Sequence, residues 1–150
     1  MTPKIGFAKV RPVRSPERGT PKSAGIDFFV PEDFQAVMLA PQNSVLIPSG
    51  IHVKVPTGHA LIFHNKSGVG SKLKLDRLAE VVDEDYTGEL HLNVVNTGNT
   101  AVRIEPGMKL LQGLLIPILY SETEEFTSTD ELYAGFQTER GAAGFGSTGA

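Results

Sequence analysis

The stretch Ala79-Glu-Val-Val-Asp-Glu-Asp-Tyr-Thr-Gly-Glu-Leu-His-Leu-Asn-Val-Val-Asn96 decides the fold class of this chain. Apolar residues run up to Asp83, an acidic turn with Tyr86 and Gly88 follows, and apolar and polar residues then alternate. Two extended runs joined by a turn predict a β-hairpin. Its tip carries carboxylates and a tyrosine, which are either a solvated turn or the working end of an active site.

Short strands joined by turns are expected along the rest of the chain. Sixteen glycines and ten prolines interrupt the sequence, and no segment sustains a long helical period. Pro48-Ser-Gly50 is expected to be one of the turns. Strands are expected in residues 4–13, 23–30, 37–39, 45–47, 51–55, 60–63, 101–104 and 108–120, with a short helical turn around 130–133. The sequence therefore predicts an all-β protein.

Composition narrows the class of protein and its partners. The 150 residues fit one domain, and the net charge of −3 provides no basic field for nucleic acid. Cysteine is absent, which excludes disulfides and thiolate zinc sites, and the four histidines show no metal-binding spacing. No apolar run approaches the roughly 18 residues of a membrane span, and the N-terminus lacks the apolar core of a signal peptide. A cytoplasmic protein without nucleic-acid or membrane partners is expected.

Polar groups inside apolar segments are candidate site residues. Asp27 stands between apolar neighbours, where a carboxylate is costly unless it is paired or faces a polar cavity; the alternative is an edge-strand acid in water. Gln112 is the single amide in a long apolar run and needs a partner, either the backbone or a ligand. The loop 64–72 supplies lysine, serine and glycine groups that could hold a phosphate, although such clusters are more often ordinary loops.

The segment Thr138-Glu-Arg-Gly-Ala-Ala-Gly-Phe-Gly-Ser-Thr-Gly-Ala150 is too rich in glycine to build a core. Its spacing superficially fits the nucleotide P-loop, but Ser147 replaces the lysine of that motif. Arg140, Ser147 and Thr148 can still bind phosphates, and a base can stack on Phe145. We expect a tail that is mobile without ligand and orders over a triphosphate; a disordered end without function is the alternative.

Together these segments resemble the five motifs of the trimeric deoxyuridine triphosphatases, the dUTPases. The match spans nearly the whole chain in the right order. The third and fifth motifs are highly specific, whereas the other three are weak alone. The motifs stand in this sequence as Ala24-Gly-Ile-Asp27, Lys66-Ser-Gly68, Val82-Asp-Glu-Asp-Tyr-Thr-Gly88, Gly107 to Pro117 with Gln112, and Arg140-Gly-Ala-Ala-Gly-Phe-Gly-Ser-Thr-Gly149.

The resemblance implies a jelly-roll-like dUTPase β-clip domain over residues 1–137 and a flexible glycine-rich lid over residues 138–150. It implies a homotrimer in which three subunits build each active site and the tail of one closes over the pocket of a neighbour. The implied reaction is hydrolysis of dUTP to dUMP and pyrophosphate, with Mg²⁺ on the triphosphate. If the chain is viral, its cytoplasmic location would be that of the host.

The resemblance also assigns roles to individual residues. Asp83 would be the general base that activates a water for attack on the α-phosphorus, and Asp85 would support the turn. Tyr86 would pack beneath the deoxyribose and exclude a 2′-hydroxyl. The other implied contacts are the backbone of Val81 and Val82 on the uracil edge, Lys66, Ser67, Gly68 and Gln112 on the phosphates, Arg140, Ser147 and Thr148 on the distal phosphates, Phe145 with Gly146 over the base, and Asp27 through water near the metal.

Several positions depart from the family pattern. Glu80 replaces a glycine beside the backbone that would read the base, and Arg77 stands where many bacterial members have asparagine. Lys66 keeps the charge of the usual arginine without its bidentate fork. Met108-Lys109 replaces a frequent Asp-Arg pair, so a structural ion pair there could be lost. The sequence looks like a divergent member of the family.

Two other functions are open on the sequence. A dCTP deaminase would share the fold, but its catalytic glutamate is missing from the corresponding segment His91-Leu92-Asn93, and it would lack the tail. A regulatory or protein-binding module with the dUTPase fold is the other alternative. Asp83, Tyr86 and Arg140 are all present, which argues against an inactive enzyme but leaves room for a protein partner.

Overall fold

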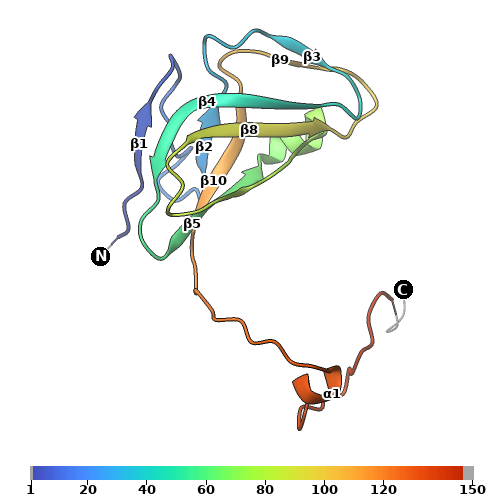
Figure 1. Ribbon diagram of the computed structural model, residues 1–150. Helices are drawn as coiled ribbons and strands as arrows, with labels where there is room; N and C mark the ends of the chain where they lie inside the picture. Colours follow the sequence, from blue (N-terminus) through green and yellow to red (C-terminus); the bar gives the residue numbers. More distant parts are fainter. Residues whose placement is uncertain (1, 147–150) are drawn as a thin grey trace. The chain divides into compact units, whose positions relative to one another are not determined.

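Two four-stranded antiparallel sheets build the main unit of this chain, in a computed structural model that describes residues 2–146 (Figure 1). The first sheet has the order β1 (Gly6–Lys9), β4 (Ser44–Lys54), β8 (Glu89–Asn96) and β6 (Leu75–Arg77). The second has the order β2 (Ile26–Phe29), β10 (Lys109–Pro117), β5 (His59–Asn65) and β7 (Val81–Val82). A separate ladder joins β3 (Val37–Leu39) to β9 (Val102–Ile104).

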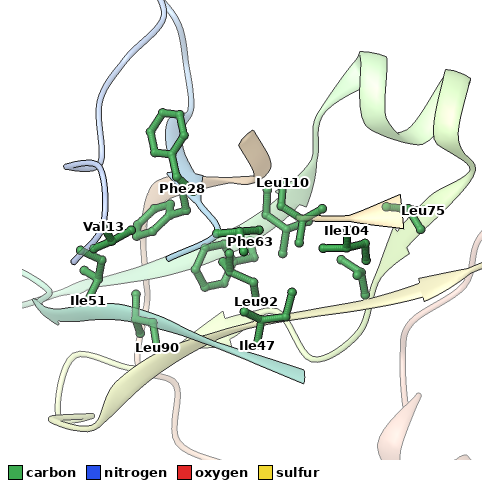
Figure 2. Close-up of a cluster of buried hydrophobic side chains, with 14 of the residues drawn as sticks. Val13, Phe28, Ile47, Ile51, Phe63, Leu75, Leu90, Leu92, Ile104 and Leu110 are labelled. Atoms are coloured by element: carbon green, nitrogen blue, oxygen red, sulfur yellow. The ribbon is translucent and has the colours of Figure 1, made fainter. Parts of the chain in front are cut away.

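Alternating side chains of both sheets share one hydrophobic core (Figure 2). Along β8, Leu90, Leu92 and Val94 are buried while the residues between them are more exposed, as period-two patterning predicts. The rings of Phe28 and Phe63 meet edge to face, with centroids 5.0 Å apart and planes at 76°. Each large apolar side chain that is fully buried contributes about 1.5–3 kcal/mol. The prediction of an all-β protein is confirmed.

The stretch that predicts a hairpin is instead a connection between the two sheets. β7 pairs with β5, placing Val82 opposite Leu61, whereas β8 pairs with β4 and β6. Residues 83–88 therefore carry the chain from one sheet to the other, and the hairpin prediction is wrong. Alternation shows which face of a strand is buried, but it does not select the strand that supplies the hydrogen bonds.

Pro48-Ser-Gly50 lies within β4 and does not end a strand. The pairing of β4 with β8 shifts register between Pro48 and His52, as in a β-bulge. Gly50 has a φ of +75°, a conformation that glycine adopts without steric cost. The predicted turn is therefore wrong, because the irregularity is absorbed inside one long strand that pairs with both β1 and β8.

The chain from Tyr120 onwards forms a second unit, separate from the compact unit that ends at Leu119. Its helix α1 (Thr129–Leu132) begins where the Ser128 side chain accepts a hydrogen bond from the Glu131 amide at 3.2 Å. Within residues 2–146, no helix combines the length and the apolar character needed to cross a bilayer. The expected boundary between domain and lid at residue 138 falls inside the second unit and stays a prediction.

Candidate functional site

A pocket where β7 leads into the connection to β8 contains four of the predicted site residues. Val81 and Val82 line it from β7, and Asp83 and Tyr86 line it from the connection. The pocket has a volume of about 230 Å³. It is completed by Phe63, Ala79, Glu80, Glu89, Leu90 and His91. The structure thus brings together the residues predicted to act on the water, the sugar and the base.

Asp83 and Tyr86 are presented by a hydrogen-bonded turn. The Tyr86 amide donates to the Asp83 carbonyl at 3.2 Å, and the Tyr86 hydroxyl donates to the Glu89 carbonyl at 3.0 Å. Gly88 lies against the tyrosine, since a Cβ at this position would be only 2.4 Å from the hydroxyl oxygen. The Asp83 residue is exposed. Its carboxylate can therefore meet a water molecule and a substrate from the solvent side.

Glu84 connects this turn to the rest of the domain by a hydrogen bond. Its carboxylate accepts a hydrogen bond from the amide of Gly58, in the turn between β4 and β5. Asp85, which was expected to support the turn, is exposed. The sequence does not distinguish these two neighbouring acids, because the role depends on which side chain faces the turn at Gly58.

Glu89 ties the start of β8 to the N-terminal segment. Nε and Nη2 of Arg11 donate to its two carboxylate oxygens at 2.7 and 3.2 Å, and the Gly50 amide donates at 2.8 Å. The Arg11 hydrogen bonds outweigh burial and hold the pKa of Glu89 below its ordinary value. This bidentate pair steadies the residue whose carbonyl receives the Tyr86 hydroxyl. Sequence analysis missed it, because no local pattern links residues 78 positions apart.

Replacing Glu89 by glutamine should lower the free energy of unfolding by about 1 kcal/mol at pH 7. Because folding depresses the pKa of Glu89, the ion pair stabilises the protein above the unfolded-state pKa, and this contribution is lost as the pH falls through the folded-state pKa. The difference between parent and variant in urea denaturation should therefore shrink between about pH 5 and about pH 3. A difference that stays constant over this range would exclude the ion pair as its source.

Asp27 is 2% exposed and is paired with two lysines. The Lys66 ammonium donates to Oδ1, and Nζ of Lys109 lies 3.0 Å from Oδ2. The second contact is an ion pair without hydrogen-bond geometry, so Oδ2 accepts no hydrogen bond. Burial raises the pKa of Asp27, but Lys66 and Lys109 together outweigh it and leave the pKa below its ordinary value. The expectation that this acid is paired is confirmed.

The pairing of Lys109 with Asp27 is an ion pair that the sequence does not predict. The expectation that the usual Asp-Arg ion pair is lost with Met108-Lys109 stays a prediction. The structure places the Lys109 ammonium on the buried carboxylate. The ion pair is thus formed across β10 and β2, where sequence neighbours give no information about the partner.

Gln112 joins Asp27 and Lys66 in a second group of predicted site residues. On β10 it lies opposite Asp27 of β2 on one side and His64 of β5 on the other. Its side-chain amide donates to the Asn65 carbonyl at 2.9 Å, so the predicted pairing with backbone is confirmed. A Cβ at Gly25 would lie 2.2 Å from the Gln112 side-chain oxygen, which explains the glycine there.

Ser67 and Gly68 begin an exposed turn directly after Lys66. The Gly70 amide donates to the Lys66 carbonyl at 2.8 Å, and a π-helical turn, η1 (Val69–Leu73), follows. Gly68 has an ordinary right-handed φ of −67°, and a Cβ there would meet nothing within 4 Å. Neither packing within this chain nor backbone conformation requires this glycine, and its predicted contact with a phosphate stays a prediction.

The remaining predicted residues belong to the unit that begins at Tyr120. Nε of Arg140 donates to the Ala143 carbonyl at 2.8 Å. Phe145 and Gly146 have φ values of +49° and +88°, and the Phe145 ring is fully exposed. Ser147 and Thr148 lie outside the described residues. Contacts of these five residues with a substrate stay predictions.

A magnesium ion held by protein side chains alone has no site in residues 2–146, where no three histidine, aspartate or glutamate groups gather. Mg²⁺ bound to a triphosphate needs only one or two carboxylates and keeps several waters. Both oxygens of Asp27 already face ammonium groups. The residues present therefore fit an ion carried by the substrate, and a contact of Asp27 with such an ion through water stays a prediction.

Comparison with known proteins places this arrangement in a family. A dUTPase family model matches residues 11–149. The chain is 40% identical over 138 residues to the deoxyuridine 5'-triphosphate nucleotidohydrolase of Bordetella avium (strain 197N), covering 89% of this chain and 87% of that protein. It is 38% identical over 141 residues to the enzyme of the same name from Polynucleobacter necessarius, with the same coverage.

Solved structures agree with the sequence relatives. The dUTPase of Staphylococcus bacteriophage 80alpha, solved with dUPNHPP, has a TM-score of 0.84 at 25% identity, covering 99% of this chain and 100% of that chain. A mutant dUTPase from phage phi11 of S. aureus is described as coordinating a structural Mg(II) ion. It has a TM-score of 0.74 at 24% identity, covering 85% of this chain and 99% of that chain. With the family model matching most of its length, the chain belongs to the dUTPase family.

Proposed function

We propose that this chain hydrolyses dUTP to dUMP and pyrophosphate, with Asp83 as the general base. The observation that carries this proposal is the exposed Asp83 carboxylate in one pocket with Tyr86 and the edge of β7. Asp83 takes a proton from a water molecule, whose oxygen attacks the α-phosphorus. The bond from the α-phosphorus to the bridging oxygen breaks, and pyrophosphate leaves. Such a reaction needs a positioned water, a base and charge neutralisation.

The edge of β7 supports recognition of the base. β7 is the last strand of its sheet, and the Phe63 amide donates to the Glu80 carbonyl at 2.8 Å. Val81, which lies opposite Ile62, is therefore in a non-hydrogen-bonded pair, and its backbone groups point away from β5. Uracil presents both a donor and acceptors on one edge, which the outward amide and carbonyl of a strand can meet. Tyr86 packs against the deoxyribose and leaves no room for a 2′-hydroxyl.

Lys66, Ser67, Gly68 and Gln112 hold the phosphates in this proposal. Lysine supplies the charge, and serine and the glycine amide supply hydrogen-bond donors to the phosphate oxygens. Lys66 is paired with Asp27, so it must share or leave that carboxylate when a phosphate binds. Mg²⁺ on the triphosphate supplies further charge neutralisation, and Asp27 is the residue that would hold it through water.

A homotrimer with shared active sites explains why the predicted residues fall into separate groups. Neither Lys66 nor Gln112 lines the pocket at β7. The tail residues belong to the second unit of the chain. We infer that three copies combine these groups, with the tail of one copy closing over dUTP bound by its neighbours. Arg140, Ser147 and Thr148 then bind the distal phosphates, and Phe145 and Gly146 cover the base.

A regulatory role is the second candidate function. The 80alpha relative is described as one of the phage dUTPases that control transfer of virulence genes by a G protein-like mechanism. Such a role would add a protein partner in the cytoplasm and would not replace catalysis, because Asp83 and Tyr86 are both in the pocket. Deamination of dCTP is not favoured, since Asn93 occupies the position expected for its catalytic glutamate.

Hydrolysis in isotopically labelled water tests the proposed position of attack. If the water attacks the α-phosphorus, the heavy oxygen appears in dUMP and the pyrophosphate is unlabelled. We expect this result, read by mass spectrometry of both products. Label in pyrophosphate instead would place the attack on the β-phosphorus and contradict the proposed mechanism.

A further inference from the structure

A salt bridge between Arg77 and Glu80 stands at the wall of the pocket. Nε of Arg77 donates to the Glu80 carboxylate. Glu80 lines the pocket directly before Val81 and Val82. The Arg77 and Glu80 side chains are 29% and 38% exposed, so water screens their interaction only in part. Both residues differ from those usual in the family at these positions, and the structure shows that the two side chains contact each other.

The backbone holds Arg77 and Glu80 in a fixed relation. Arg77 ends β6 in one sheet, and Glu80 precedes β7 in the other. Between them, the Leu78 amide is bonded to β8 at 2.8 Å, and Ala79 turns the chain with a φ of +48°, uncommon for a residue other than glycine. The Glu80 carbonyl accepts from Phe63 at 2.8 Å. The separation of the two side chains is therefore set by the sheets.

Arg77 is also held from its other side. The Asn65 side-chain oxygen accepts from the Arg77 amide at 2.9 Å, and the Asn65 side-chain nitrogen donates to Asp76 at 2.6 Å. Nη1 of Arg77 lies 3.4 Å from the same Asp76 oxygen. The guanidinium is thus oriented by contacts within the chain, which lowers the entropic cost of holding it on Glu80.

An unpaired carboxylate at Glu80 would change the base that the pocket prefers. Cytosine presents an exocyclic amine where uracil presents a carbonyl oxygen, and glutamate readily accepts a hydrogen bond from that amine. The same carboxylate would repel the uracil oxygen. Pairing with Arg77 engages one of the two carboxylate oxygens and offsets the negative charge. The pocket would thus discriminate against cytosine because the carboxylate that could bind its amine is already engaged by Arg77.

We propose that Arg77 favours uracil over cytosine by engaging the Glu80 carboxylate. The inference rests on the proposed function, in which the base lies against Val81 and Val82. Arg77 acts as a positioning residue, because it does not line the pocket and works through Glu80, which does. Glu80 is the specificity-determining group, neutralised in the parent protein and exposed to the substrate when Arg77 is removed.

Arg77→Ala tests this proposal through the ratio of kcat/KM for dCTP to kcat/KM for dUTP. The ratio is measured by pyrophosphate release from the full-length protein with Mg²⁺. We expect it to rise about tenfold, the effect of one hydrogen bond that discriminates between bases. Arg77→Gln keeps the aliphatic stem and the backbone bond to Asn65 and should shift the ratio in the same direction, so the test survives poor folding of the alanine variant.

Two further variants separate this effect from a general disturbance. Arg77→Ala combined with Glu80→Ala should return the ratio to that of the parent, because no free carboxylate remains. Arg103→Ala is the control, because it removes the guanidinium of another ion pair. Nε of Arg103, in β9, lies 2.8 Å from the Glu105 carboxylate. This variant should leave the ratio unchanged. A parental ratio in both Arg77 variants overturns the inference. A parent that does not release pyrophosphate from dUTP overturns the proposed function itself.

Discussion

Replacing Asp83 by asparagine is expected to lower kcat for dUTP about a thousandfold, the usual contribution of a general base. The amide has nearly the same shape as the carboxylate but cannot take the proton of the attacking water. Because the pocket and the turn are otherwise unchanged, the affinity for a non-hydrolysable dUTP analogue should stay within about threefold of the parent. Single-turnover kinetics and isothermal titration calorimetry measure the two quantities separately.

The neighbouring acid Asp85 provides the matched control. It lies in the same exposed turn as Asp83 but does not line the pocket. Asp85→Asn removes the same charge and should leave kcat within about twofold of the parent, since surface charges interact weakly through water. Equal losses in the two variants would indicate that the charge of the turn matters and that neither acid is the base.

Deleting the tail after Glu139 is expected to reduce kcat/KM for dUTP about a hundredfold, the effect of losing charged hydrogen-bond donors from a transition state. The deletion removes Arg140 and Phe145 but leaves the hydrophobic core intact, because all of its members precede Tyr120. Sedimentation analysis should therefore show the same oligomeric state as the parent, which we propose to be a trimer. Loss of the trimer would make the tail structural, and unchanged kinetics would exclude it as a lid.

A point substitution in the intact tail shows how much of this loss belongs to one group. Arg140→Ala should account for most of the deletion effect at saturating Mg²⁺, if the guanidinium binds the distal phosphates. Phe145→Ala should act mainly on KM, because a stacked ring binds the substrate and the transition state alike. If Phe145→Ala caused most of the deletion effect and Arg140→Ala changed mainly KM, the assigned roles would be reversed.

Most strands could be predicted from the residues along them, although β6 (Leu75–Arg77) was not expected. Leu90, Leu92 and Val94 alternate with polar residues, and β8 buries them as expected. Pairing could not be predicted in the same way. Val81 and Val82 carry no signal for β5 as their partner, because alternation does not select the strand that supplies the hydrogen bonds. The hairpin prediction failed for this reason, although its turn holds the site residues.

For interactions between side chains, the sequence likewise predicted that a residue needs a partner but did not predict which partner it has. An acid such as Asp27 among apolar neighbours must be compensated, and the structure compensates it. Its second partner, Lys109, could not be identified, because the two meet only when β2 lies beside β10. Arg77 and Glu80 are each unusual for the family, but no sequence pattern links them. Their contact depends on the left-handed turn at Ala79.

Pyrophosphate release from dUTP, dCTP, dTTP and UTP by the parent protein with Mg²⁺ tests the proposed activity most directly. The contacts proposed for uracil at β7 and for the sugar at Tyr86 predict a strong preference for dUTP over all three competitors. A parent that turns over dCTP or UTP as efficiently as dUTP, or that releases no pyrophosphate from dUTP, would contradict the account of this site.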